Sequence, residues 1–283
     1  MSAVRMDGKA LSAKVRSSIL AETEELKKKG VTPGLAVIIV GNDPASEIYV
    51  RNKEKACAEC GFYSGKYALP AETSQEELLG LIDQLNHSPQ ISGILCQLPV
   101  PDHISEEAVI NAIDPKKDVD AFHPVNVGKI MVGNFDFVPC TPAGVMELLD
   151  EYQIDIKGKE CVVVGRSNIV GKPMSMLLLH RHGTVTMCNS RTQHLDEVCR
   201  RADILVAAVG KAGFITPDMV KDGAVVIDVG INRNAEGKVC GDVDPAVMEK
   251  ASYMTPVPGG AGPMTITMLM KNTLKAAKIQ NGL

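Results

Sequence analysis

The stretch Glu160-Cys-Val-Val-Val-Gly-Arg-Ser-Asn-Ile-Val-Gly-Lys-Pro173 decides the fold of the second half of the chain. A short apolar run, Glu160–Val164, leads directly into a glycine-containing loop and then into a helical pattern that extends to His182. Strand, glycine-rich loop and helix in this order form the context of a dinucleotide site, because glycine permits a tight turn and amides at the helix start can receive a pyrophosphate. The spacing differs from G-x-G-x-x-G, so an ordinary strand-to-helix turn explains this stretch equally well.

The next predicted strand, Thr184–Cys188, ends in Asn189-Ser190-Arg191-Thr192. An NAD site usually places a carboxylate here to bind the ribose hydroxyls. This chain instead has an arginine between two hydroxyl groups, which suits a 2′-phosphate, and Arg166 can add a second cation. The sequence therefore predicts NADP rather than NAD as the cofactor.

Two further apolar runs follow, Ile204–Val209 and Ala224–Val229. They end in segments that contain Gly210, Gly213 and Gly230. Glycines at strand ends are expected to keep side chains away from a bound ligand, as a cofactor site requires.

The first half also alternates predicted strands, at Leu35–Val40, Gly65–Leu69 and Ser92–Leu98, with amphipathic helical segments. This alternation favours a parallel α/β fold, and 283 residues are enough for two domains. Mixed turn and strand signals over residues 125–140 place the domain boundary there, before a helix expected from Thr141 to Tyr152.

The composition limits the classes of partner. A net charge of −4, from 30 basic and 34 acidic residues, gives no electrostatic footprint for nucleic acid. No apolar run approaches the ~20 residues needed to cross a bilayer, and the N-terminus lacks the apolar core of a signal peptide. The pair Cys57-Ala-Glu-Cys60 has no second pair at metal-site spacing, so structural cysteines in a reducing cytosol are expected rather than a metal site.

One stretch of the first half, Tyr49-Val-Arg-Asn-Lys53, carries an unusual lysine. It lies in a helix predicted over Pro44–Cys60, with Asp43 as the expected N-cap. Lys53 shares a partly apolar face with Tyr49, and a desolvated lysine has a lowered pKa and can act as an acid or base. Alternatively, Lys53 extends to solvent within an ordinary charged face.

Polar residues also follow the strand at Ser92–Leu98. Gln97 lies at its end, and the loop Asp114–Pro124 carries Asp118 and Asp120. Ligands of parallel α/β sheets bind at the carboxyl ends of strands, so these groups are candidate ligand contacts. A side chain that ties down a loop, for Gln97, and ordinary turn chemistry, for the two aspartates, are the alternatives.

Six motifs together resemble one family, the bifunctional methylenetetrahydrofolate dehydrogenase/methenyltetrahydrofolate cyclohydrolase of the FolD type. The resemblance covers essentially the whole chain. It rests on the stretches Tyr49–Lys53, Gln97-Leu-Pro99, Pro115–Pro124, Gly165–Pro173, Asp228-Val-Gly-Ile-Asn232 and Pro258-Gly-Gly-Ala-Gly-Pro-Met-Thr265. The family pattern has Gly at the position of Ala121 and Val at the position of Ala261.

The resemblance implies two α/β domains with a folate cleft between them. Residues 1–140 would form a folate-binding catalytic domain, and the last helix, residues 263–283, would pack back onto it. Residues 141–262 would form a Rossmann-like NADP-binding domain.

The implied chemistry has two steps. Hydride passes from 5,10-methylenetetrahydrofolate to NADP, and water then opens the resulting 5,10-methenyl group to give 10-formyltetrahydrofolate. By resemblance, Lys53 serves the hydrolytic step, Gln97 hydrogen-bonds Lys53, Tyr49 stacks on the substrate and Asp120 accepts hydrogen bonds from the pterin.

The resemblance also implies two binding sets and no metal site. The substrate set adds Cys96, Leu98, Pro258, Gly259 and Gly262 to the four residues just named, and the cofactor set is Gly165, Arg166, Ser167, Ser190, Arg191 and Ile231. It further implies a cytoplasmic homodimer that acts on tetrahydrofolate one-carbon substrates, feeds purine, methionine and histidine biosynthesis, and has neither nucleic acid nor membrane as a partner.

Two other functions fit part of the sequence. A dehydrogenase for another substrate, such as an amino acid, would explain the nucleotide half but not the group around Lys53. A nucleotide-binding scaffold without catalysis would have a broken catalytic group, whereas every polar member of the group is present.

Overall fold

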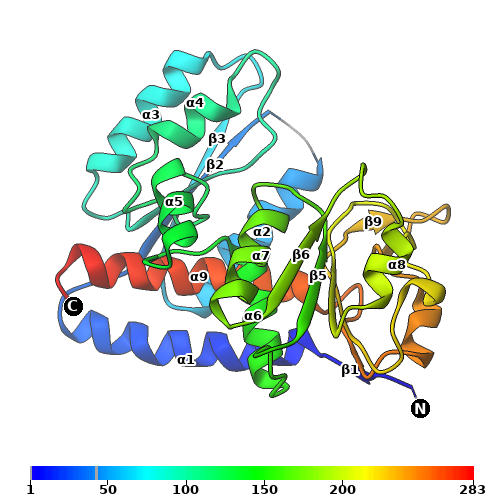
Figure 1. Ribbon diagram of the computed structural model, residues 1–283. Coiled ribbons are helices and arrows are strands. Elements are labelled where there is room, and N and C mark those ends of the chain that lie inside the picture. Colours follow the sequence, from blue (N-terminus) through cyan, green and yellow to red (C-terminus); the bar gives the residue numbers. More distant parts are fainter. Residues whose placement is uncertain (1, 42–43) are drawn as a thin grey trace. The chain divides into compact units, whose positions relative to one another are not determined.

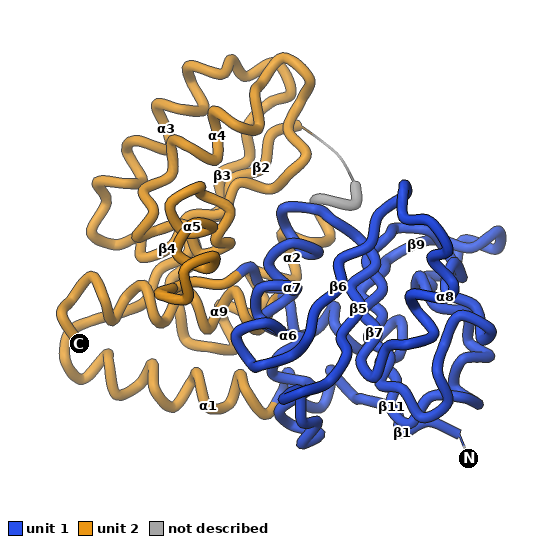
Figure 2. The backbone as a smooth tube through the Cα atoms, in the orientation of Figure 1, with its two compact units in different colours: residues 1–13, 139–265 blue, residues 14–138, 266–283 orange. Residues whose placement is uncertain are grey.

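The computed structural model describes residues 2–41 and 44–283 of the chain (Figure 1). The expected N-cap Asp43 lies outside the described residues. The chain divides into two compact units (Figure 2). Unit 1 comprises Met1–Ala13 and Pro139–Thr265, and unit 2 comprises Lys14–Val138 and Ile266–Leu283.

Unit 1 is built on a six-stranded sheet of order β1-β11-β8-β7-β5-β6, in which every strand pair is parallel. The central strands are continuous apolar runs because helices and loops cover both faces of such a sheet. The strands are β1 (Val4–Arg5), β5 (Glu160–Val164), β6 (Thr184–Cys188), β7 (Ile204–Ala207), β8 (Val225–Asp228) and β11 (Tyr253–Met254). The remaining elements are α6 (Cys140–Glu151), α7 (Gly171–His180), α8 (Leu195–Arg200), the 3-10 helices η1 (Pro217–Met219) and η2 (Pro245–Glu249), and the hairpin of β9 (Asn232–Arg233) and β10 (Val239–Cys240).

Unit 2 contains a smaller parallel sheet of order β3-β2-β4. Its central strand β2 (Gly34–Val40) is buried at every residue, and α3 begins with a reciprocal capping box between Ser74 and Glu77. The other elements are β3 (Tyr63–Leu69), β4 (Gly93–Cys96), α2 (Pro44–Glu59), α3 (Gln75–His87), α4 (Glu106–Ala112) and α5 (Pro124–Val132). Two long helices have residues in both units: α1 (Gly8–Lys28) and α9 (Ala261–Gln280).

The observed division differs from the one expected from the sequence chiefly at the N-terminus of the chain. Residues 1–13 belong to unit 1 rather than with residues 14–138, because β1 pairs in parallel with β11. Residues 266–283 belong to unit 2, where Asn272 donates to the carbonyls of Val119 at 2.8 Å and Val138 at 2.9 Å. Strand pairing and buried side-chain contacts, rather than distance along the chain, set these boundaries.

The mixed turn and strand signals assigned to residues 125–140 were misleading, since helix α5 occupies much of this segment. His123 caps α5 by accepting from the amide of Val125 at 3.1 Å, and Pro124 takes the first helical position. The helix ends at Gly133, whose φ of 82° is left-handed.

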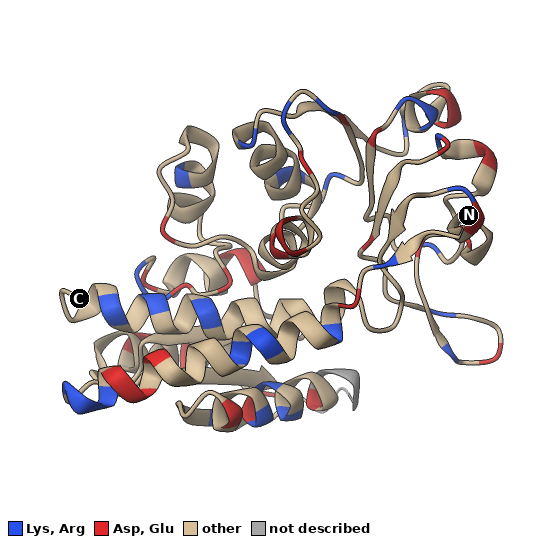
Figure 3. Cartoon of the chain, turned by 90° about the horizontal axis from the view of Figure 1, so that it is seen from below, with Lys and Arg blue, Asp and Glu red and all other residues tan. Residues whose placement is uncertain are grey.

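Lys and Arg as well as Asp and Glu residues occur in helices and loops throughout the described part of the chain (Figure 3). Within residues 2–41 and 44–283, no helix is long and apolar enough to cross a membrane. In the same ranges no group of three or more His, Cys, Asp or Glu side chains could hold a metal ion. Cys57 and Cys60 are buried free thiols on α2.

Ala121 occupies a backbone conformation that favours glycine. Its φ is 58°, and its side chain is fully buried. A left-handed residue with a Cβ carries a strain of about 1–2 kcal/mol, which a glycine at this position would avoid.

We expect Ala121→Val to lower the free energy of unfolding by about 2 kcal/mol or more, because a β-branched side chain is both strained at this φ and too large for the site. Ala121→Gly is the matched control. We expect it to stay within about 1 kcal/mol of the parent, since relief of strain offsets the lost methyl group and the added chain entropy. Urea unfolding curves of the three proteins measure this, and equal stability of the valine variant and the parent would contradict it.

Candidate active site

Lys53 and Gln97 meet at the carboxyl end of β4. The half-buried Lys53 on α2 donates from Nζ to Oε1 of Gln97 at 2.8 Å, so the contact implied by the resemblance is present. Gln97 is itself held by two hydrogen bonds. Its backbone amide donates to the carbonyl of Ile38 at 2.8 Å, and its side-chain Nε2 donates to the carbonyl of Leu98 at 2.8 Å. The carboxamide oxygen is therefore directed at the lysine.

Asp120 reaches the same place through the loop after α4. The segment before it extends the sheet, since Asp118 bridges Ile94 of β4 in parallel and the amide of Ile94 donates to the carbonyl of Lys117 at 2.8 Å. Burial raises the pKa of the Cys96 thiol to about 12, the charge of Asp120 raises it further, and the charge of Lys53 opposes both. Both charges thus act on the last residue of β4.

Asp118 is a residue of this site whose role the sequence did not reveal. It is buried and accepts from the amide of His123 at 2.9 Å, from the amide of Phe122 at 3.3 Å and from Nδ2 of Asn126 at 2.8 Å. Burial raises the pKa of its carboxyl, and these donors oppose that rise. Asp118 therefore fixes the loop that carries Asp120.

The other residues of the substrate set fall into two groups. Tyr49 is 40% exposed one turn before Lys53 on α2, Cys96 is buried, and Leu98 is half-buried directly after Gln97. These belong to unit 2, together with Lys53, Gln97 and Asp120. Pro258, Gly259 and Gly262 belong to unit 1, in the loop before α9 and its first turn.

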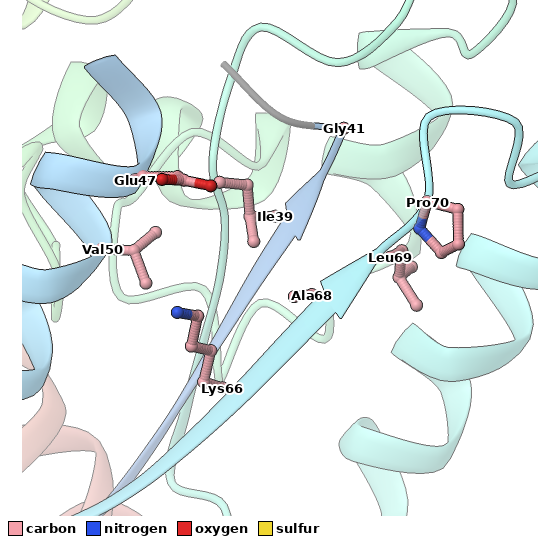
Figure 4. Close-up of a pocket in the computed structure, with 8 residues that line it drawn as sticks. All are labelled: Ile39, Gly41, Glu47, Val50, Lys66, Ala68, Leu69 and Pro70. Carbon is pink, nitrogen blue, oxygen red and sulfur yellow. The ribbon is translucent and has the colours of Figure 1, made fainter. Parts of the chain in front are cut away.

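A pocket of about 350 Å³ lies on another face of α2, between that helix and strands β2 and β3 (Figure 4). Its apolar lining includes Ile39, Val50 and Leu69, and the charged groups of Glu47 and Lys66 flank it. None of the residues that the resemblance assigns to substrate lines this pocket.

Unit 1 has a pocket of about 370 Å³ at the carboxyl ends of three adjacent strands, β6, β5 and β7. Gly165 follows β5 with a φ of 139°, and a Cβ there would overlap the carbonyl oxygen of Ala208. Three members of the expected cofactor set, Gly165, Arg166 and Ser190, line the pocket. The glycine therefore permits the close approach of the two backbones that follow β5 and β7.

The remaining cofactor candidates lie outside the pocket lining. Arg191 is exposed in the turn after β6, where its amide donates to Oδ1 of Asn189 at 3.0 Å, and Ile231 is 56% exposed after β8. Ser167 lies in the loop before α7, and its Oγ accepts from the amides of Val170 at 3.1 Å and Gly171 at 3.3 Å. Those amides at the helix start are therefore bonded within the chain, which differs from the pyrophosphate contact expected of them.

Lys211 and Phe214 also line this pocket and were not singled out from the sequence. The ammonium group of Lys211 lies 5.8 Å from the centroid of the Phe214 ring, a cation–π contact. Lys211 and Phe214 follow β7, just as other lining residues follow the adjacent parallel strands β5 and β6. This position after a strand was the signal from which they could have been predicted as ligand contacts.

The glycine at position 230 has a different purpose from the one predicted. A Cβ at Gly230 would overlap the carboxyl group of Asp242, so this glycine makes room for a buried aspartate rather than for a ligand. Asp228 is buried beside it and accepts from the amides of Gly230, Asp242 and Val243, each at 2.9 Å. Burial raises the pKa of Asp228 to about 6, these hydrogen bonds oppose the rise, and the charge of Asp242 adds to it.

The comparisons with known proteins agree with this geometry. The model of the tetrahydrofolate dehydrogenase/cyclohydrolase catalytic domain matches residues 6–120, and that of the NAD(P)-binding domain matches residues 139–281. The chain belongs to the tetrahydrofolate dehydrogenase/cyclohydrolase family. The resemblance drawn from six motifs is thereby confirmed, and so is the expected α/β fold with a Rossmann-like NAD(P)-binding domain.

Relatives in this family match along their whole length. The chain is 66% identical to the bifunctional protein FolD of Acetivibrio thermocellus over 281 residues, 99% of each chain. It is 57% identical to that of Bacillus subtilis, over 98% of this chain and 99% of the relative. Among solved structures, the FolD methylenetetrahydrofolate dehydrogenase/cyclohydrolase of Campylobacter jejuni is 50% identical with a TM-score of 0.97, covering 99% of this chain and 100% of that one. The Trypanosoma brucei enzyme, complexed with NADP cofactor and inhibitor, is 40% identical with a TM-score of 0.95 and full coverage of both chains.

Asp228 gives the stability of unit 1 a defined dependence on pH. Its pKa is about 6 in the native state against an ordinary value of 3.8, so the native state binds this proton more tightly than the unfolded chain. The contribution of Asp228 to stability therefore increases as the pH falls through about 6. It levels off near pH 3.8, the ordinary pKa that applies to the unfolded chain.

We expect the free energy of unfolding of the parent, minus that of Asp228→Asn, to increase by up to about 3 kcal/mol between pH 7.5 and pH 4. Taking the difference removes the titration of all other groups that both proteins share. Urea unfolding at four pH values measures it, and a difference that stays constant or falls would show that Asp228 titrates normally.

Proposed function

We propose that this chain oxidises 5,10-methylenetetrahydrofolate to 5,10-methenyltetrahydrofolate with NADP and then hydrolyses the product to 10-formyltetrahydrofolate. The observation that carries the proposal is the 2.8 Å hydrogen bond between Lys53 and Gln97, beside Asp120, inside the segment matched by the catalytic-domain model. The family membership of the chain supports the pairing of the two activities.

In the first step NADP, when bound, supplies the hydride acceptor. The one-carbon bridge loses hydride and becomes a methenyl cation, so no proton is taken up or released by the protein. The chain therefore has only to hold two ligands in the correct orientation.

In the second step water adds to the methenyl carbon, one proton is released, and a ring C–N bond breaks to leave the formyl group. We assign the proton transfer to Lys53. Its partner Gln97 is a neutral amide, which fixes the position of the amine without holding a proton on it as a carboxylate would.

Substrate recognition is assigned to the residues around this pair. Asp120, half-buried in a fixed loop, would accept hydrogen bonds from the amino-bearing edge of the pterin. The exposed ring of Tyr49 would stack on the flat rings of the substrate. Cys96 and Leu98, with Pro258, Gly259 and Gly262 of unit 1, complete the proposed substrate set.

The proposed cofactor site is the pocket of unit 1, which lies within the matched NAD(P)-binding domain. Its residues suit a phosphorylated nucleotide, because Gly165 allows close backbone approach and Arg166 and Ser190 present a cation and a hydroxyl. Arg191 supplies a second cation, and the turn Asn189–Thr192 contains no carboxylate that would repel a 2′-phosphate. We also propose that the chain acts as a cytoplasmic homodimer, without nucleic acid or membrane as partners, and supplies one-carbon units for purine, methionine and histidine biosynthesis.

The first test follows NADPH and the methenyl intermediate after 5,10-methylenetetrahydrofolate and NADP are added. We expect the parent to reduce NADP with little methenyl accumulation. Lys53→Met should reduce NADP but accumulate methenyl, with cyclohydrolase turnover lowered by about 100-fold or more, because the variant keeps the cofactor site and the other substrate contacts and loses the proton-transfer group.

Lys55→Met is the control, since Lys55 is exposed on the same helix and pairs only at 3.9 Å with Glu59. It should behave as the parent. Normal methenyl hydrolysis by the Lys53 variant would disprove the role of Lys53, and no reduction of NADP by the parent would disprove the proposed function.

The second test concerns the choice of cofactor. We expect Arg191→Ala to raise the KM for NADP about tenfold and to leave the KM for NAD within about twofold, because only NADP carries the phosphate that the guanidinium binds. Initial rates with both cofactors measure this. Faster turnover of NAD than of NADP by the parent would overturn the assignment.

A further inference from the structure

Asp242 is a buried carboxylate that neither the motifs nor the proposed chemistry use. It is 0% exposed, yet four donors surround it. Oδ2 accepts from the amides of Val209 at 2.6 Å and Gly210 at 3.0 Å, and Oδ1 accepts from the amide of Lys211 at 2.9 Å and from Nδ2 of Asn232 at 2.8 Å. This many donors compensate the cost of removing an ionised carboxylate from water.

The four donors come from two loops at the same edge of the sheet. Val209, Gly210 and Lys211 follow β7, and Asn232 follows β8, which is the neighbouring strand. One carboxylate therefore joins the loops at the carboxyl ends of two adjacent strands.

The first of these loops forms part of the cofactor pocket. Val209 and Lys211 line the pocket together with Gly165 and Arg166 of the loop after β5. Because the amides of residues 209–211 all donate to Asp242, this loop can offer a ligand only its side chains and carbonyl groups. The conformation that presents the Lys211 ammonium beside Phe214 is thus set by Asp242.

Asp242 is itself held rigidly. Its amide donates to Oδ1 of Asp228 at 2.9 Å, and the amide of Asp228 donates to Oγ1 of Thr255 at 2.7 Å. Gly230 and Gly241 leave the space for the two carboxyl groups, since a Cβ at either position would overlap one of them. The two carboxylates therefore belong to one buried network of hydrogen bonds.

We propose that Asp242 is a positioning residue for the nicotinamide cofactor, which sets the affinity for NADP by fixing the loop Val209–Lys211 and does not touch the cofactor itself. The inference rests on the proposed function, because it takes the pocket of unit 1 as the NADP site. It adds a residue whose full burial excludes direct contact with any ligand.

The test replaces one acceptor oxygen by an amino group in Asp242→Asn, so that two of the four donors lose their acceptor. We expect the KM for NADP to rise by about tenfold or more while kcat of the dehydrogenase stays within about twofold, because a loop that holds the cofactor equally in ground and transition states affects binding alone. Titration of the fluorescence of NADPH gives its Kd directly, and the chain has no tryptophan to interfere.

Cyclohydrolase turnover of methenyltetrahydrofolate needs no NADP, so it should remain at the parent value and report an intact unit 2. Asp244→Asn is the matched control, two residues along the chain, where the carboxylate only caps the amide of Ala246 at 2.9 Å. It should leave the KM for NADP unchanged.

Asn232→Ala is the second variant if Asp242→Asn does not fold, since it removes one donor and leaves the three amides in place. It should raise the KM for NADP about threefold with unchanged kcat. A KM for NADP equal to that of the parent in whichever of the two variants folds, or a loss of kcat without a change in KM, would overturn the inference. A parent that binds no NADPH would instead overturn the proposed function.

Discussion

A carboxylate that leaves water must be surrounded by hydrogen-bond donors, and both units meet this constraint with their own loops. In unit 2 the donors to Asp118 come from the loop that carries Asp120 and from the start of α5. In unit 1 Asp228 and Asp242 take seven hydrogen bonds between them, six of them from backbone amides. Since an unpaired buried charge costs several kcal/mol, the loops cannot relax without a large loss of stability.

These rigid loops lie at the carboxyl ends of the parallel strands, where polar side chains can meet a ligand. Strands of such a sheet are buried along their length, so side chains that meet a ligand have to project from the carboxyl ends. Lys53 comes from a helix and Gln97 from the residue after a strand, and the amide of Gln97 is itself part of the sheet pairing. A proton-transfer group on regular elements is held more accurately than one on a free loop.

Most elements could be read from local patterns. Fully buried strands such as β2 and β8 are continuous apolar runs, and Ser74 with Glu77 forms the capping box that marks the start of α3. Helix α5 was missed because its nine residues are rich in valine and contain a glycine, so its propensity is low. Its signals were the cap at His123 and the proline that follows, and tertiary packing supplied the rest of its stability.

The sequence by itself determined the family, the alternation of strands and helices and the candidate residues Lys53, Gln97, Asp120 and Gly165, because these depend on residue type and short spacing. Only the tertiary structure decided which partners meet. Strand β1 joins the sheet through β11 near the other end of the chain, and the missing side chain of Gly230 leaves room for Asp242. These contacts are non-local, and no periodicity along a chain encodes which distant groups will share a buried site.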